Sequence, residues 1–121
     1  MNDCIFCKIA SKEIPSNIVF ENEYVVAFED LAPVAPVHIL IVPKKHVANV
    51  MELGQNESET EEDLTYIKEV FKAAKEIAKL KCIDNSGFRI INNCGDDAGQ
   101  TVKHIHFHLI GGENLGELIA K

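Results

Sequence analysis

The sequence has 121 residues, of which 46% are hydrophobic and 26% charged, and its net charge is −7 at pH 7. This length suits one domain with one hydrophobic core, and the composition is that of an ordinary globular chain. No apolar run approaches the roughly 20 residues of a membrane span, and the N-terminus shows no secretion signal. We therefore expect a cytoplasmic protein without membrane contact.

The negative charge is concentrated in one stretch. Six of the 19 acidic residues lie between Glu52 and Asp63, and the remaining 13 nearly balance the 12 basic residues. We find no basic stripe that would follow a polyanionic backbone, so nucleic acid is not an expected partner. A small anionic ligand is compatible with the sequence, because backbone amides and a few side chains can hold a phosphate.

The N-terminal half predicts a short helix and three strands. Residues 4–10 have the apolar side of a single helical turn, and strands with a tight turn between them are predicted over residues 18–21 and 24–29. Residues 38–42 are almost wholly apolar, which predicts a central strand buried on both faces. A short turn or single helical turn is predicted over residues 47–53.

The C-terminal half predicts one long helix over residues 58–81, with Ser58 and Glu61 as a capping box. The acidic run then stabilises the helix N-terminus through the helix dipole, so we assign it no function. A strand over 88–92 and a loop over 93–101 follow, and the whole pattern predicts an α+β fold with an antiparallel sheet of about five strands. The apolar stripe of the helix comprises Leu64, Ile67, Phe71, Ala74, Ile77 and Ala78.

The segment Lys103–Gly112, KHIHFHLIGG, alternates histidines with apolar residues. A period of two is typical of a strand, so one face carries Ile105, Phe107 and Leu109 toward the core. The other face carries three histidines, a costly choice for mere solvation because histidine titrates near neutrality. This pattern indicates a metal site or histidine chemistry, at which all five histidines could converge: His38, His46, His104, His106 and His108.

Two arrangements of metal ligands are compatible with these residues. A zinc ion on His104, His106 and His108 would keep an open fourth position. However, alternate residues of a strand lie roughly 6.6–6.8 Å apart, which is too far for all three to reach one ion. Cys4 and Cys7 have the Cys-x-x-Cys spacing of structural zinc sites, which two histidines would complete. We favour this arrangement over a redox-active pair and over simply buried cysteines.

Nucleophilic chemistry is the other interpretation of the histidine strand. An imidazole is nucleophilic at neutral pH, and phosphorus is a suitable electrophile. A backbone carbonyl bound to the other ring nitrogen would fix the tautomer and make the attacking nitrogen more basic. The preceding loop contains Gly95, Gly99, Gln100 and Thr101, whose amides and polar side chains suit a phosphate, although the same composition is typical of an ordinary hairpin loop.

Several motifs together resemble one family. HIHFHLI is similar to the His-x-His-x-His motif, followed by two apolar residues, of the HIT (histidine triad) superfamily of nucleotide hydrolases and transferases. The following Gly-Gly, the preceding GQTVK, and the stretches APVHILIVPKKH and IFCKIASKEIPSNIVFENE resemble its Hint branch of nucleotide-binding phosphoramidases. The resemblance extends from about Cys4 to Gly112. It implies a single HIT domain over residues 1–121, with a sheet continued across a homodimer.

The resemblance also implies a role for each matching residue. His106 would be the nucleophile that attacks the α-phosphorus, His108 would assist the phosphate and leaving group, and His38 would support the imidazoles. Thr101 stands where many members have serine and would act beside the phosphate. The nucleotide would contact residues that match three subsites: Asn93, Gly99, Gln100, Thr101 and His108 at the phosphate, Asp30 at the ribose, and Ile5, Phe6, Ile9, Phe28 and Leu31 at the base.

A structural Zn²⁺ is implied by relatives of bacterial type that keep the Cys-x-x-Cys pair. The matching ligands here are Cys4, Cys7, His46 and His104. The implied activity is hydrolysis of purine nucleoside phosphoramidates, or related nucleotidyl conjugates, to an AMP- or GMP-type monophosphate. A diadenosine polyphosphate hydrolase is an alternative that the Gly-Gly pair disfavours. A nucleotide-binding regulator with incidental hydrolysis is another.

Overall fold

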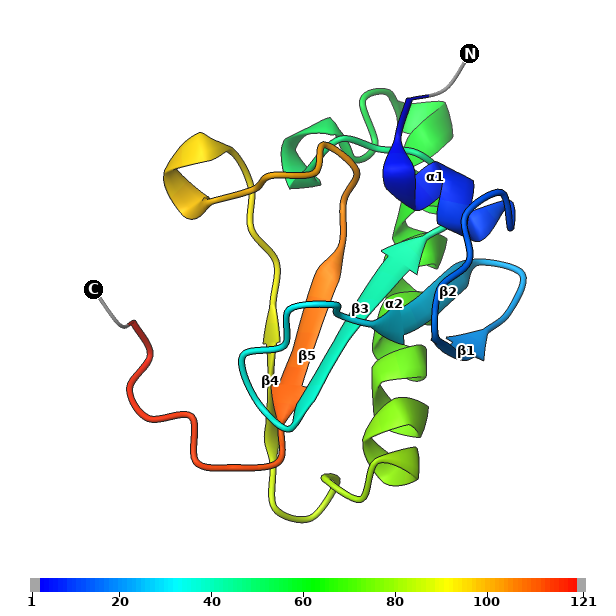
Figure 1. The fold of residues 1–121 in the computed structure, drawn as a ribbon. Helices are drawn as coiled ribbons and strands as arrows, with labels where there is room; N and C mark the ends of the chain where they lie inside the picture. The colour runs from blue at the N-terminus through cyan, green and yellow to red at the C-terminus, as the bar shows by residue number, and fades with distance from the viewer. Residues whose placement is uncertain (1–2, 120–121) are drawn as a thin grey trace.

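The computed structural model describes residues 3–119 and confirms an α+β fold built on one five-stranded sheet (Figure 1). Every neighbouring pair of strands is antiparallel, and the strand order is β1-β2-β3-β5-β4. The elements are helices α1 (Ile5–Ala10) and α2 (Glu57–Leu80), strands β1 (Ile18–Glu21), β2 (Val25–Glu29), β3 (Val37–Pro43), β4 (Phe88–Ile91) and β5 (Phe107–Gly111), and the short 3₁₀ turns η1 (Val50–Glu52) and η2 (Asp96–Ala98).

The two helices cover opposite faces of the sheet (Figure 1). Helix α2 packs on the face that carries Ile39 and Ile41 of β3, and α1 packs on the face that carries Leu40 and Val42. This division follows from the alternation of side chains along a strand. Strand β3 is thus buried on both faces, as its apolar sequence predicts. Neither helix is both long and apolar enough to cross a membrane.

The histidine strand is shorter than its sequence predicts, because β5 begins only at Phe107. Ahead of it, the backbone N–H of Ile105 donates to the Val47 carbonyl at 2.7 Å, and the His104 ring bonds the Pro43 carbonyl at 2.8 Å. These bonds attach the segment to the end of β3 and to the loop after it, and they replace a regular ladder. The predicted alternation of sides still holds, since Ile105 and Phe107 are buried in the core beneath α2.

Helix α2 begins one residue earlier than predicted, and its cap differs. Asn56 is the N-cap, and its side-chain oxygen accepts from the Glu59 backbone N–H at 3.0 Å. The Asn56 amide in turn donates to the Glu59 carboxylate at 3.2 Å. The predicted capping box of Ser58 and Glu61 is therefore wrong by two residues, since asparagine is an equally good N-cap and stands first.

The core-facing side of α2 also differs from the predicted stripe. Leu64 and Phe71 are 55% and 52% exposed, whereas Val70 and Ala73 are buried. Small residues, among them Ala73, take up the side that faces the sheet. The buried side chains of the helix are Asp63, Glu69, Val70, Ala73, Ala74, Ile77 and Ala78.

One residue of the acidic run does more than favour the helix N-terminus. Asp63 is only 2% exposed and accepts hydrogen bonds from Lys45 Nζ and the Gly54 backbone N–H, both at 2.6 Å. Burial alone would raise the pKa of this carboxyl, but the bonds from Lys45 and Gly54 outweigh it and hold the pKa below its usual value. The pair ties α2 to the loop that carries His46.

Candidate functional site

The five histidines gather on the sheet face that α1 covers. His38 comes from the start of β3, His46 from the loop after it, and His108 from β5, while His104 and His106 precede β5. The register explains the meeting: Leu40 pairs with His108 and His38 with Ile110, so His38 and His108 are diagonal neighbours on one face. The predicted convergence therefore exists, and backbone contacts divide it into two groups with one ring between them.

The first group is the thiol–histidine cluster of Cys4, Cys7, His46 and His104. One ligand atom from each residue lies within 4.8 Å of the others. His104 Nδ1 lies 3.3 Å from Cys4 Sγ, 3.5 Å from Cys7 Sγ and 3.1 Å from His46 Nδ1, and His46 Nδ1 lies 3.3 Å from Cys7 Sγ. Cys4 is also the N-cap of α1, and its Sγ accepts from the Cys7 N–H.

These distances suit a tetrahedral zinc ion. Zn–N bonds of about 2.0–2.1 Å and Zn–S bonds of about 2.3 Å place nitrogen pairs about 3.3 Å and nitrogen–sulfur pairs about 3.6 Å apart. His104 Nε2 donates to the Pro43 carbonyl, which directs the lone pair of Nδ1 toward the cysteines. Burial lowers the pKa of His104 to about 4, so the ring is neutral at pH 7, as a metal ligand must be. The cluster therefore fits zinc.

His106 lies between the two groups and has one defined tautomer. Its Nδ1 bonds the His104 backbone carbonyl at 2.8 Å, and because a carbonyl only accepts, Nδ1 carries the proton. The lone pair of the neutral ring is therefore on Nε2. The Asn92 side chain donates to the His106 carbonyl at 2.9 Å, which fixes the main chain at this point.

The second group is the relay group of Asp30, His38 and His108. The Val34 backbone N–H donates to His38 Nδ1 at 3.1 Å, so the proton of the His38 ring is on Nε2. That Nε2–H lies 2.9 Å from His108 Nδ1 and 3.4 Å from an Asp30 carboxylate oxygen. Because His108 Nδ1 accepts a hydrogen bond from His38, the ring proton of His108 is on its Nε2.

The electrostatics of His108 agree with this tautomer. Burial, together with the neighbouring His106 and His38, lowers the pKa of His108 to about 4. The ring is neutral at pH 7 and presents an N–H donor at Nε2. Although the relay atoms lie within 4.8 Å of one another, the proton on His38 Nε2 occupies the position that a metal ligand would need.

The residues predicted for phosphate binding lie in the loop before β5. Gly99 adopts a left-handed conformation, with φ of 77°, at the end of η2, and Thr101 is exposed beyond it. Unlike the side chain of Thr101, that of Gln100 is buried. Its amide accepts from the Gly95 N–H and donates to the carbonyls of Ala48 and Val102, so it holds the loop in shape.

The residues predicted around the base and ribose differ in exposure. Phe6, Ile9 and Phe28 are buried in the apolar cluster under α1, whereas Ile5 is about half exposed and Leu31 fully exposed. Asp30 has one carboxylate oxygen bonded to the Ala32 N–H at 2.8 Å, and its second oxygen faces His38. The structure therefore brings Phe6 and Asp30 to the histidines and leaves Leu31 in solvent.

Sequence reasoning missed Asn92 and Val34, which act on the histidines through hydrogen bonds. Asn92 follows β4 directly, and the pairing of Ile91 with His108 brings it beside the histidine segment. An explicit register for the two last strands would have identified it. Val34 contributes only its backbone N–H, so its side chain carries no signal of this role.

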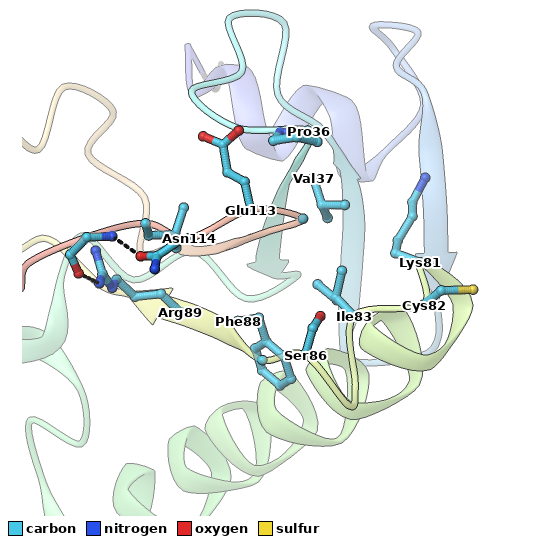
Figure 2. Close-up of a pocket in the computed structure, with 14 residues that line it drawn as sticks. Pro36, Val37, Lys81, Cys82, Ile83, Ser86, Phe88, Arg89, Glu113 and Asn114 are labelled. Atoms are coloured by element: carbon cyan, nitrogen blue, oxygen red, sulfur yellow. Dashed lines mark hydrogen bonds between the residues drawn. The ribbon is translucent and has the colours of Figure 1, made fainter.

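A cavity of about 780 Å³ lies away from the histidines, between the end of α2, strand β4 and the C-terminal segment (Figure 2). Arg89 donates to the Gly116 carbonyl at 3.0 Å, and Asn114 accepts from the Gly116 N–H at 2.8 Å. Lys81 pairs with Glu29 at 3.6 Å. At this cavity Arg89 thus holds the C-terminal segment, and Lys81 joins the end of α2 to strand β2.

An antiparallel five-stranded sheet with this histidine row defines a histidine-triad domain. The chain belongs to the HIT family: the HIT domain model matches residues 11–115. It is 41% identical to the purine nucleoside phosphoramidase of Escherichia coli K12, over 98% of this chain and 94% of that protein.

Solved structures agree with this assignment. A HIT family hydrolase from Clostridium thermocellum superposes with a TM-score of 0.89 at 46% identity, with 99% of both chains covered. A histidine triad protein from Clostridium difficile superposes with a TM-score of 0.87 at 47% identity, with 97% of this chain and 96% of that chain covered.

Proposed function

We propose that this protein hydrolyses nucleoside 5′-phosphoramidates or related nucleotidyl conjugates, with a purine preferred, to the nucleoside monophosphate. The observation that carries the proposal is the tautomer of His106: its Nδ1–H is held by the His104 carbonyl, so the Nε2 lone pair is available for attack. The similarity to the purine nucleoside phosphoramidase of Escherichia coli supports the substrate class.

In the first step, His106 Nε2 attacks the α-phosphorus, a nitrogen–phosphorus bond forms, and the bond from phosphorus to the leaving nitrogen breaks. The leaving group takes up one proton from solvent and departs as an amine. In the second step, the oxygen of water attacks phosphorus, the bond to His106 breaks, and its electron pair returns to Nε2. The monophosphate is released with one proton to solvent.

The relay group supports both steps by orientation. His38 Nε2–H bonds His108 Nδ1, which turns the Nε2–H of His108 into a fixed donor for the phosphoryl oxygens. Asn93, Thr101 and the backbone amides of the loop around Gly99 would supply further donors, and Gln100 would hold that loop in shape through its bonds to Gly95, Ala48 and Val102. This donor set is neutral, and it suits a phosphoryl group whose charge grows as phosphorus is attacked.

The nucleoside would lie beside α1. The buried Phe6, Ile9 and Phe28 would form the back of an apolar pocket, and the exposed Ile5 and Leu31 would form its rim, a lining that suits a flat purine. Asp30 would accept from the ribose hydroxyls. Zinc bound at the thiol–histidine cluster would be structural: it would join α1 to the segment before β5 and leave the reaction to the histidines.

We further propose that the protein is a homodimer that continues its sheet across β4. Strand β4 is at the edge of the sheet, and its first residue, Phe88, is 38% exposed. Phe71 of α2 lines the same pocket as Phe88 and is 52% exposed. An unpaired edge strand next to an apolar helix face favours pairing with a second copy. Sedimentation of the pure protein tests this, and a monomeric mass at micromolar concentration would contradict it.

The activity is tested with adenosine 5′-phosphoramidate under single-turnover conditions, with quenching and intact-mass measurement. We expect a transient adduct of one adenylyl group on the wild-type chain and AMP as product. His106→Asn should form no adduct, with turnover reduced by at least roughly 10³-fold. Binding of AMP without any turnover by the wild type would favour a nucleotide-binding regulator, and faster cleavage of diadenosine polyphosphates would favour that alternative substrate.

A further inference from the structure

Phe6 lies inside the Cys-x-x-Cys segment and touches the nucleophile. It is 6% exposed, and its ring meets the His106 ring edge-on, with centroids 4.9 Å apart and planes at 80°. The same ring lies 6.1 Å from the His104 ring and 5.6 Å from Phe28. Because Phe6 sits between Cys4 and Cys7 on α1, its position depends on how those two residues are held.

His104 makes a second connection between the same two places. Its ring nitrogen Nδ1 belongs to the thiol–histidine cluster, while its backbone carbonyl holds the Nδ1–H of His106. The other ring nitrogen of His104 bonds the Pro43 carbonyl. The contacts of both ring nitrogens therefore restrain the residue whose carbonyl fixes the His106 tautomer.

The main chain of His106 is held separately, by the Asn92 amide. The rotation and the tautomer of the His106 ring are then set by its side-chain surroundings, which are Phe6, the His104 carbonyl and the His108 ring, whose centroid lies 5.2 Å away. The contacts of His106 with Phe6 and with the His104 carbonyl both depend on the thiol–histidine cluster. His104 is one of the candidate ligands, and Phe6 lies between the two cysteine ligands. An edge-on aromatic contact is directional, so it favours one orientation of the ring over others.

We propose that the thiol–histidine cluster, through Phe6 and the His104 carbonyl, is a positioning device for His106, so that metal binding controls the rate of nucleophilic attack. Phe6 is then a positioning residue as well as part of the base pocket. The inference rests on the proposed function in taking His106 as the nucleophile. Its structural part, the link between metal and ring orientation, does not depend on any substrate.

The test compares zinc-loaded and chelator-treated protein by long-range ¹⁵N–¹H NMR of the histidine rings. With zinc, we expect His106 to show the Nδ1–H tautomer alone; without zinc, we expect averaging between tautomers. Phe6→Leu with stoichiometric zinc should lower kcat about tenfold. Its KM should change less than kcat, whereas loss of a base contact alone would raise KM.

Val26→Ala is the matched control, since Val26 is fully buried in the same apolar cluster as Phe6. It should lower the melting temperature while kcat and the His106 signal stay as in the wild type. The proposal is overturned if the His106 tautomer is the same with and without zinc, or if Phe6→Leu raises KM at unchanged kcat. A wild type without turnover would instead refute the proposed function, and the NMR comparison would still decide the link.

Discussion

The thiol–histidine cluster and the relay group lie on the same face of the sheet, and in both of them the candidate ligand atoms approach within 4.8 Å of one another. In the thiol–histidine cluster, the Pro43 carbonyl accepts a hydrogen bond from His104 Nε2–H, so the lone pair on Nδ1 faces the cysteines. In the relay group, the Val34 N–H donates a hydrogen bond to His38 Nδ1, so the Nε2–H of His38 faces His108. A single hydrogen bond to the backbone thus decides whether the opposite ring nitrogen of a histidine offers a lone pair to a cation or an N–H to a hydrogen-bond acceptor.

The largest expected effect is on metal content. Cys4→Ser/Cys7→Ser should lose its zinc and several kcal/mol of unfolding free energy with it, because zinc binds only the folded cluster tightly. Asp30→Asn, which removes the carboxylate of the relay group, should keep stoichiometric zinc. Elemental analysis and thermal unfolding measure both, and zinc retained by the cysteine variant would mean that the relay group also binds it.

A second test separates the two nitrogens of His38. In His38→Asn the side-chain oxygen can accept from Val34 but does not extend to His108, whereas in His38→Gln the longer amide can donate to His108. We expect kcat to fall about 100-fold in the asparagine variant and to recover in part in the glutamine variant, with KM nearly constant. Equal losses in both variants would show that the relay needs an imidazole and not only a donor.

The smallest expected effect is a pH dependence of stability from His108. In the unfolded chain this residue takes up a proton near pH 6.5, but in the folded protein only near pH 4. The unfolded state therefore binds more protons between these values, and the unfolding free energy falls as the pH drops through that interval. The unfolding free energy of the metal-free wild type and of metal-free His108→Asn is measured by urea unfolding at pH 7 and at pH 4.5. From pH 7 to pH 4.5 it should fall by roughly 1–2 kcal/mol less in the variant than in the wild type. Parallel pH curves would contradict the lowered pKa.

The sequence predicts those features of the fold that depend on local alternation. Ile105, Phe107 and Leu109 point into the core as their period of two requires, and β3 is buried on both faces. The sequence does not predict the residue at which β5 begins, because that residue depends on bonds to Val47 and Pro43, which are far away in the chain. The exposure of Phe71 likewise depends on which side of α2 packs on the sheet, a tertiary contact that the helical period alone does not settle.

The candidate site divides in the same way. The residue types indicate histidine chemistry and a cysteine-containing metal site, and the resemblance to HIT proteins names individual positions. The tautomers follow from backbone groups at Val34, Pro43 and His104, which have no signature in the side-chain sequence. Gln100 shows the converse, since the sequence predicts it as a phosphate-binding residue, whereas its side-chain amide bonds backbone groups at Gly95 and Ala48.

The irregular segment before β5 has a consequence for protein design. In a regular strand, the carbonyl of His104 and the N–H of Ile105 would belong to a ladder with the neighbouring strand. Here the carbonyl bonds the ring two residues further on, and the N–H bonds Val47. Three histidines grafted at alternate positions of an ideal strand would reproduce the spacing but leave the middle ring free to choose its tautomer. A transplant of this chemistry has to carry the backbone path from residue 104 to residue 106 along with the side chains.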